Sequence, residues 1–294
     1  MKYLSSMKKK LNENWLDEVK DTKKEGVDDI INAEGRLLSK YKDYEGIVGV
    51  YTAKPEETNV GDIKDVLKKF YERPPKKLGD LLTDRRHNHD LNECPFCGSP
   101  FSPDTLDHFM PKEDWPEFSI FPNNLVPQCK GCAPIKGRKY FCETYQTAIF
   151  IHPIYSDLLS KVKFKISIEF DEEDKIPAFG LKIIIPKGLS QEDKAKLSSH
   201  FMELKIKKRV SGFCYREYNS WKTKLERNRF DIRIALKQRI DEISKSEISK
   251  DWKTSLYQEI LGSDDLIDYL NSLNPCNREG LENDVPLGTE ELSI

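Results

Sequence analysis

The sequence predicts an α+β fold that is mostly helical, with a small cysteine-rich module between helical flanking regions and one additional β-hairpin. Three observations support this class. Apolar residues recur at helical spacing in the first and last parts of the chain. Between them, Pro, Gly, Cys and His become frequent, and a polar–apolar alternation follows. The predicted organisation is a helical N-terminal region at 1–90, the cysteine-rich module at 91–150, a β-hairpin plus helical C-terminal region at 151–274, and an acidic mobile tail at 275–294.

Two helices of the N-terminal region are predicted from the spacing of their apolar residues. In residues 28–41 and 63–71, these residues fall on one face of a helix, at Ile30, Ile31, Leu37 and Leu38 in the first and at Ile63, Val66, Leu67 and Phe70 in the second. Pro74 and Pro75 end the second helix, because proline cannot continue the hydrogen-bond ladder.

A β-hairpin is expected after the cysteine-rich module. Residues 163–170 alternate polar and apolar side chains, as a half-buried strand does, and residues 179–185 supply the returning strand after an acidic turn. From Ser190 the pattern is helical again and runs, with breaks, to about Leu273. Ser190 and Asp193 resemble a capping box, in which a hydroxyl binds the backbone at the start of a helix.

Composition and charge limit the classes of function. The chain has 294 residues, of which 37% are hydrophobic and 33% charged, so it is polar but able to bury a core. Its net charge of −2 argues against tight, independent binding to duplex DNA, which favours a clearly basic protein. A basic surface must therefore be local, or a partner must supply it.

The sequence predicts a cytoplasmic protein. No apolar run reaches the roughly 18 residues that a membrane span needs. The lysines near Met1 are not followed by the apolar segment of a signal peptide. In that compartment the seven cysteines are expected to be thiols or metal ligands rather than disulfides.

Charge is unevenly distributed in the C-terminal region. Residues 201–240 contain twelve Lys or Arg against four Asp or Glu, whereas residues 241–294 contain four against thirteen. A charged helix is usually a solvated face, but this basic block also carries three aromatic residues that can stack on bases, at Tyr215, Tyr218 and Trp221. The block is therefore a candidate for nucleic-acid or partner contact, with contacts expected at Lys207, Lys208 and Arg209.

Four cysteines form two CxxC pairs, Cys94-Pro-Phe-Cys97 and Cys129-Lys-Gly-Cys132. Each pair places two sulfurs on one tight turn, and a glycine follows or lies within each pair, as such turns favour. Four thiolates match tetrahedral Zn²⁺ and leave no open position. The spacing therefore predicts one structural zinc ion, since two such pairs in one short segment rarely arise by chance.

Between the two pairs, Asp107 and His108 are adjacent. Neighbouring residues point to opposite faces of a regular strand, so both serve one site only where a strand ends, and Pro111 marks such an end. A carboxylate suits Mg²⁺ or Mn²⁺, and an imidazole can take a proton from water. These are the two parts that phosphodiester hydrolysis needs. Alone, an Asp-His pair is more often an ordinary polar turn.

Residues 94–139 resemble the HNH family of ββα-metal (His-Me finger) endonucleases, in the subgroup with two CxxC zinc knuckles. The resemblance implies that Asp107 ligates the catalytic Mg²⁺ or Mn²⁺ and that His108 is the general base. It implies that Asn124, rather than Asn123, holds the loop that places the imidazole. It also implies phosphate contacts near the family's Lys-Gly pair, at Lys136, Arg138 and Lys139. The central module would then be a zinc-stapled ββα-metal HNH module.

One position departs from the family's pattern. The residue directly after the last cysteine is normally Asn or His and is the second protein ligand of the catalytic metal, but here it is Ala133. A methyl group cannot coordinate a cation. Either the protein has naturally lost a ligand, or another residue replaces it, or the site was inactivated on purpose. The intact surroundings favour deliberate inactivation.

The resemblance implies a metal-dependent endonuclease that hydrolyses phosphodiester bonds, with DNA as the expected substrate, although the sequence does not distinguish DNA from RNA. No sequence-reading module such as a helix-turn-helix is present, so gating by a partner is expected. Bacterial antiviral-defence nuclease subunits of the Septu type are similar in pairing an HNH module with an ATPase or sensor subunit. The alternative function is a non-catalytic, zinc-stabilised binding or adaptor subunit, in which the helical flanks carry the activity.

Overall fold

The computed structural model describes residues 1–171, 173 and 175–275. Within them, α-helices predominate, and the strands are short. The helices are α1 Leu16–Lys20, α2 Val27–Gly49, α3 Lys64–Glu72, α4 Lys76–His87, α5 Ala133–Lys136, α6 Gln191–Glu203, α7 Ile206–Arg227, α8 Ile232–Asp241, α9 Trp252–Leu261 and α10 Asp264–Ser272. The strands are β1 Thr105–His108, β2 Leu125–Gln128, β3 Phe141–Cys142, β4 Thr147–Ala148, β5 Lys163–Glu169 and β6 Ala178–Ile184. The predicted α+β class is confirmed.

The N-terminal helices follow the predicted apolar spacing. The α2 helix is longer than the predicted segment, and it buries one face with residues three or four apart, Ile30, Ala33, Leu37, Tyr41, Tyr44 and Val48. Similarly, α3 buries Leu67 and Phe70. A further helix, α4, begins directly after Pro75, which provides its extended N-cap. The prolines therefore separate two helices, α3 and α4.

Three two-stranded antiparallel sheets occur in the described residues. The predicted hairpin is confirmed as β5–β6, with Phe164 opposite Ile183 and Ile166 opposite Leu181 on its apolar face. The prediction of one additional hairpin was wrong in number, because β3 and β4 form another. Each of these strands has only two residues, too few for an alternating pattern to appear in the sequence.

The helix α7 corrects the expectation for two aromatic residues of the basic block. Tyr218 and Trp221 are buried, since they share the inward face of α7 with Val210 and Leu225. Their three-residue spacing is that of a core-facing stripe rather than of a base-stacking surface. Tyr215 alone of the three is exposed. At the start of α6, the Ser190 hydroxyl accepts the backbone N–H of Asp193, as predicted.

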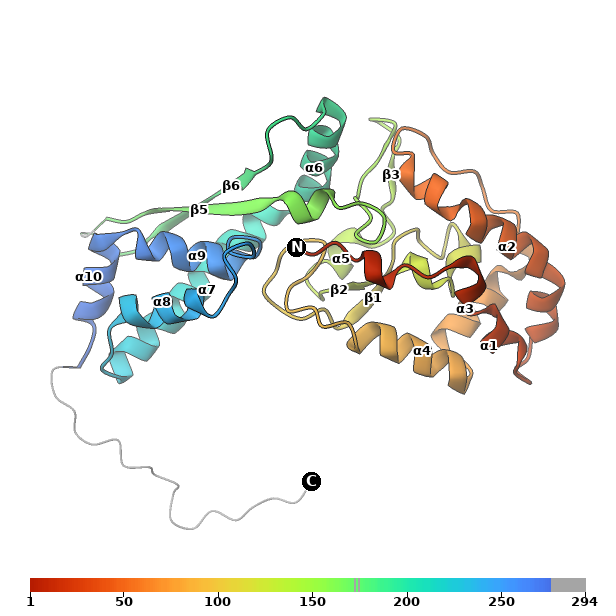
Figure 1. Ribbon diagram of the computed structural model, residues 1–294, viewed down its shortest axis with the longest axis horizontal. Helices are drawn as coiled ribbons and strands as arrows, with labels where there is room; N and C mark the ends of the chain where they lie inside the picture. The colour runs from red at the N-terminus through yellow and green to blue at the C-terminus, as the bar shows by residue number, and fades with distance from the viewer. Residues whose placement is uncertain (172, 174, 276–294) are drawn as a thin grey trace, which may run out of the picture.

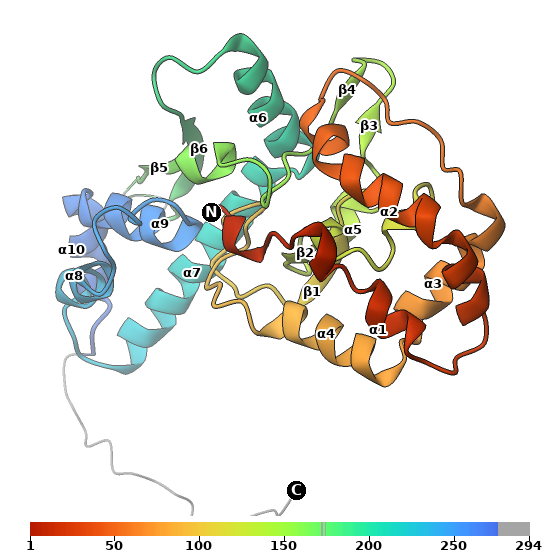
Figure 2. The same cartoon turned by 45° about the vertical axis from the view of Figure 1, so that its right-hand side comes forward.

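The pair β1–β2 and the short helix α5 lie between two larger groups of elements (Figures 1 and 2). Helices α1 to α4 lie on one side, and α7 to α10 with β5 and β6 lie on the other. Of the predicted tail, residues 276–294 lie outside the described residues. None of the described helices combines the length and apolar character that crossing a membrane demands.

Candidate functional site

The four cysteines of the two CxxC pairs meet in the interior. All four are buried, and their sulfur atoms lie within 4.8 Å of one another. The Sγ atoms of Cys97 and Cys129 are 3.7 Å apart, far longer than a disulfide bond. A tetrahedral zinc with Zn–S bonds of about 2.3 Å separates its sulfurs by about 3.8 Å. The cluster is thus positioned to hold a metal ion, and its dimensions and soft donors fit zinc.

The first CxxC turn depends on a glycine and on the C-terminal helices. Gly98 has a φ of +69°, and a Cβ atom there would lie 2.5 Å from the ring of Phe164, so no other residue fits. Its neighbours' carbonyls are bound from distant segments. His200 lies 2.6 Å from the Phe96 carbonyl, and the Trp252 indole N–H donates to the Cys97 carbonyl at 2.7 Å.

The guanidinium of Arg209, from α7, faces the sulfur cluster. It donates to the Sγ atoms of Cys132 at 3.2 Å, Cys97 at 3.5 Å and Cys129 at 3.6 Å. The donors of Arg209 are thus directed to the thiols, and nucleic-acid contact at this residue stays a prediction. Lys207 and Lys208, its neighbours in the basic block, are exposed.

Asp107 and His108 are the last two residues of β1. Their position at the end of a strand agrees with the expectation for two neighbouring residues that serve one site. In the β1–β2 ladder, Asp107 lies opposite Val126 and His108 opposite Leu125. The helix α5 follows β2, and its last residue, Lys136, is fully buried. The Lys136 ammonium lies 3.0 Å from Asp107 Oδ2. Burial raises the pKa of Asp107 to about 6, and the charge of Lys136 limits that rise.

His108 is held in one tautomer. Its Nε2 lies 2.9 Å from the carbonyl oxygen of Ser119. A carbonyl only accepts hydrogen bonds, so Nε2 carries the proton and Nδ1 keeps a lone pair. Burial lowers the pKa of His108 to about 3, although the bond to Ser119 favours the charged form. At neutral pH the imidazole is therefore uncharged, with its lone pair on Nδ1.

Asn124 fixes the loop that carries Ser119. Its amide nitrogen donates to the carbonyls of Met110 and Phe118, each at 3.0 Å. Its oxygen accepts from the Met110 N–H at 2.8 Å and from the Tyr44 hydroxyl at 2.7 Å. This buried amide thus makes four hydrogen bonds, three with the backbone of the loop and one with Tyr44 of α2. In contrast, the Asn123 side chain accepts from the Lys9 N–H at 2.7 Å and donates to the Lys9 carbonyl at 2.9 Å.

Tyr71 also belongs to the site, although no sequence motif indicates it. This residue ends the predicted 63–71 helix, and its ring packs edge-on against the His108 imidazole with centroids 4.3 Å apart. The next residue, Glu72, pairs with Lys112, and the positive charge of Lys112 helps to lower the pKa of His108. A helical stripe alone does not reveal which of its residues reaches a site on another segment.

The predicted phosphate contacts have other partners in the structure. Lys136 is directed inward, where its ammonium also donates to the carbonyls of His108 and Phe109. The exposed side chains of Arg138 and Lys139 pair with Asp114 and Glu203, each at 2.8 Å. Phosphate contact at the three residues stays a prediction, and Lys136 must leave its ion pair to make one.

Ala133 is the first residue of α5, directly after Cys132. Throughout the part of the chain that the structure describes, the four cysteines are the one group of three or more side chains placed to hold a metal ion. Asp107 therefore belongs to no such group. The methyl group of Ala133 offers no ligand atom to a cation.

Comparison with known proteins gives one relative. The chain is 28% identical over 236 residues to protein ea31 of Escherichia phage lambda, and the match covers 72% of this chain and 77% of the phage protein. No protein-family model matches the chain. No solved structure matches it. The name of the phage protein states no activity, so the chemistry of the site must be argued from its own residues.

We predict that Asn124→Ala loosens the loop and releases His108 from its tautomer. Each buried group left without a partner costs about 1–3 kcal/mol, so the free energy of unfolding should fall by about 3 kcal/mol or more. Nitrogen-15 NMR of the imidazole should change from a pure Nε2–H form to a mixture. Asn123→Ala is the matched control and should retain the Nε2–H form. Identical imidazole spectra for the two variants would contradict the assignment.

Proposed function

We propose that the protein is a metal-dependent nuclease of the HNH type that hydrolyses phosphodiester bonds. One observation carries the proposal. An uncharged imidazole, His108, has a fixed proton on Nε2 and directly follows Asp107 in the sequence at the end of β1. This arrangement supports general-base chemistry next to a hard cation ligand, and a binding scaffold has no need of it.

The four-cysteine cluster is proposed to hold a structural zinc ion. Cys94, Cys97, Cys129 and Cys132 supply four sulfurs, so the ion would have no open position for substrate. Its role would be to fix the second knuckle, from which α5 begins, relative to β1. The Lys136–Asp107 ion pair at the end of α5 depends on that placement.

We predict about one zinc ion per chain in purified protein. The reason is that four buried sulfurs within 4.8 Å of one another match tetrahedral Zn²⁺, and the single charge of Arg209 cannot balance four thiolates. Elemental analysis measures the ratio directly. Replacing Cys129 with Ser should lower both the zinc content and the folded fraction, because structural zinc supplies folding free energy. A folded protein that contains no metal would exclude this assignment.

In the proposed reaction, His108 takes a proton from water through Nδ1, and the resulting hydroxide attacks phosphorus while the bond from phosphorus to the leaving sugar oxygen breaks. The leaving oxygen takes a proton from solvent, and His108 afterwards returns its proton to water. The Ser119 carbonyl and the edge of Tyr71 keep the imidazole in position while its charge changes. A divalent cation bound at Asp107 would stabilise the negative charge that develops on the phosphate. Since Ala133 offers no ligand, the chain as it stands is proposed to be nearly inactive.

A basic cleft beside the knuckles supports nucleic acid as the substrate class. Its volume is about 750 Å³, and its lining includes Lys130, Lys205, Lys208 and Arg216. Phe101, also in the lining, is 59% exposed and offers a ring on which a base can stack. One lining carboxylate, Asp104, pairs with Lys130. DNA is proposed as the substrate on the basis of the family resemblance.

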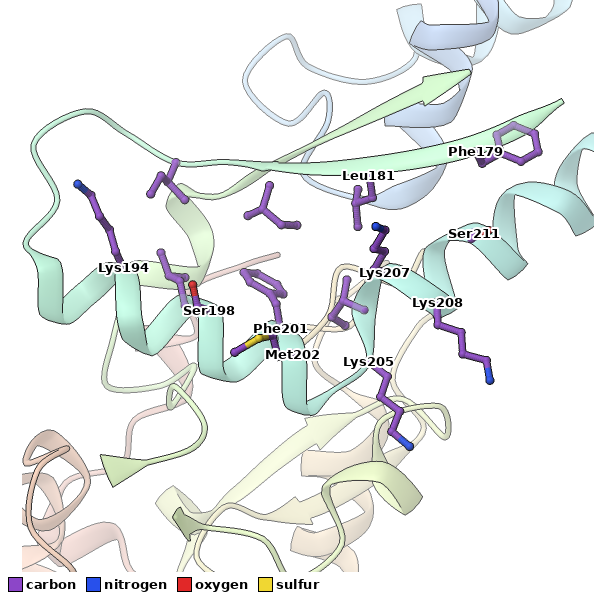
Figure 3. Close-up of a pocket in the computed structure, with 14 residues that line it drawn as sticks. Phe179, Leu181, Lys194, Ser198, Phe201, Met202, Lys205, Lys207, Lys208 and Ser211 are labelled. Atoms are coloured by element: carbon purple, nitrogen blue, oxygen red, sulfur yellow. The ribbon is translucent and has the colours of Figure 1, made fainter. Parts of the chain in front are cut away.

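A different surface favours a protein partner, and with it the alternative of a binding or adaptor subunit. A groove of about 870 Å³ lies between β6 and the α6–α7 corner (Figure 3). Its floor is apolar, and none of its lining residues is acidic. Four lysines contribute to its lining, Lys194, Lys205, Lys207 and Lys208, and two of them, Lys205 and Lys208, also line the basic cleft. Met202 on its rim is 70% exposed. This chemistry suits an acidic protein segment with apolar side chains, such as one from an ATPase or sensor subunit.

We predict that Ala133→Asn raises cleavage of supercoiled plasmid in Mg²⁺ or Mn²⁺ strongly above the parent. A second oxygen ligand would position the cation, and a misplacement of one ångström costs about a hundredfold in rate. Adding His108→Ala to this variant should return cleavage to background with the zinc content unchanged. Equal cleavage with and without His108 would exclude it as the base. Background cleavage by Ala133→Asn, with its partner present, would favour the adaptor function.

We predict that the groove binds the partner through its apolar floor. Met202→Asp places a charge on the rim and should remove a specific protein that co-purifies with the parent. Ile234→Asp is the control, because Ile234 is 59% exposed on α8 and does not line the groove. Recovery of the same protein at the same level with both variants would argue against this surface.

A further inference from the structure

The guanidinium of Arg209 fits closely against the cysteine sulfurs, Gly131 and the Trp252 ring. Three of its hydrogen bonds go to sulfur, from Nη1 to Cys132 and from Nη2 to Cys97 and Cys129. A Cβ atom on Gly131 would lie 2.7 Å from Nη2, so the second knuckle leaves room for the guanidinium by having no side chain there. On its other side the guanidinium lies 5.4 Å from the centre of the Trp252 ring.

The charge of the cluster explains why a cation belongs there. Four thiolates around Zn²⁺ carry a net charge of −2, and burying such a charge without compensation is costly. Arg209 is half-buried and brings one positive charge into contact with three of the sulfurs. Among the residues that the structure describes, no other cationic side chain donates a hydrogen bond to these sulfurs.

We propose that Arg209 is the charge-compensating partner of the zinc centre, and that through it the C-terminal helix α7 determines how tightly the knuckles retain their metal. The proposal rests on the assignment of zinc to the four cysteines. It goes beyond the nuclease reaction, because Arg209 touches the structural ion's ligands and not the end of β1. Arg209 lies outside residues 94–139, so a residue from another part of the chain would have a role at the metal site of the motif.

The shape of the side chain matters as well as its charge. A guanidinium presents several N–H groups in a rigid plane, so it can reach three sulfurs from one position. A lysine ammonium at the end of a flexible chain is a compact point charge and would contact fewer of them. Residues that bind a metal's ligands commonly change metal affinity about 10–100-fold when they are replaced.

The experiment is a competition between the zinc-loaded, full-length protein and a chromogenic chelator. Arg209→Met should weaken zinc affinity by about 10–100-fold, and Arg209→Lys should give an intermediate loss. Lys207→Met is the matched control, because it removes the same charge from the same turn of α7 and its side chain is exposed. It should release zinc as the parent does.

A spectroscopic measurement separates a direct effect on the sulfurs from a general loss of stability. In Co²⁺-substituted protein, loss of hydrogen bonds to thiolate should move the sulfur-to-metal charge-transfer band to longer wavelength in Arg209→Met but not in Lys207→Met. If Arg209→Met does not fold, Arg209→Lys carries the same test, with a smaller shift expected. Equal zinc affinities and unshifted bands in a folded, zinc-containing protein would overturn the proposal. A parent that contains no zinc would instead refute the metal assignment itself.

Discussion

The central constraint on this molecule is the meeting of four buried sulfurs from two distant turns. Cys94 and Cys97 come from the loop after α4, whereas Cys129 and Cys132 stand between β2 and α5. Four buried sulfurs this close to one another are stabilised when they bind a metal ion as thiolates. With a cation present, the start of α5 is fixed, and with it the ion pair between Lys136 and Asp107.

The two helical groups support opposite ends of this small centre. From the N-terminal side, Tyr44 binds Asn124, Tyr71 packs on His108, and Arg85 donates to the Leu125 carbonyl at 2.7 Å. From the C-terminal side, His200, Arg209 and Trp252 bind the knuckles, as described above. The end that carries His108 and the end that carries the four cysteines are therefore placed by different parts of the chain. A partner that docks on the α6–α7 corner would therefore affect the end that carries the four cysteines before it affects the end that carries His108.

The sequence predicted what depends on local spacing. Two CxxC pairs, the adjacent Asp107 and His108, the β5–β6 hairpin and the capping by Ser190 are each readable within a few residues, and the structure places them accordingly. Contacts across long separations were not readable. Arg209 was grouped with exposed lysines, because charge alone does not tell which residue of a basic helix turns inward. Composition alone also does not distinguish the apolar stripe of α7, which holds Tyr218 and Trp221, from the charged face of the same helix.

The most direct test of the account is the location of two different metals in one crystal. Anomalous diffraction at the zinc and manganese absorption edges, from Ala133→Asn protein soaked in Mn²⁺, identifies each ion by element. The account predicts zinc among the four cysteine sulfurs and manganese within about 2.5 Å of the Asp107 carboxylate, close to the side chain at position 133. Zinc in the knuckles with no manganese at Asp107, at saturating Mn²⁺, would contradict it.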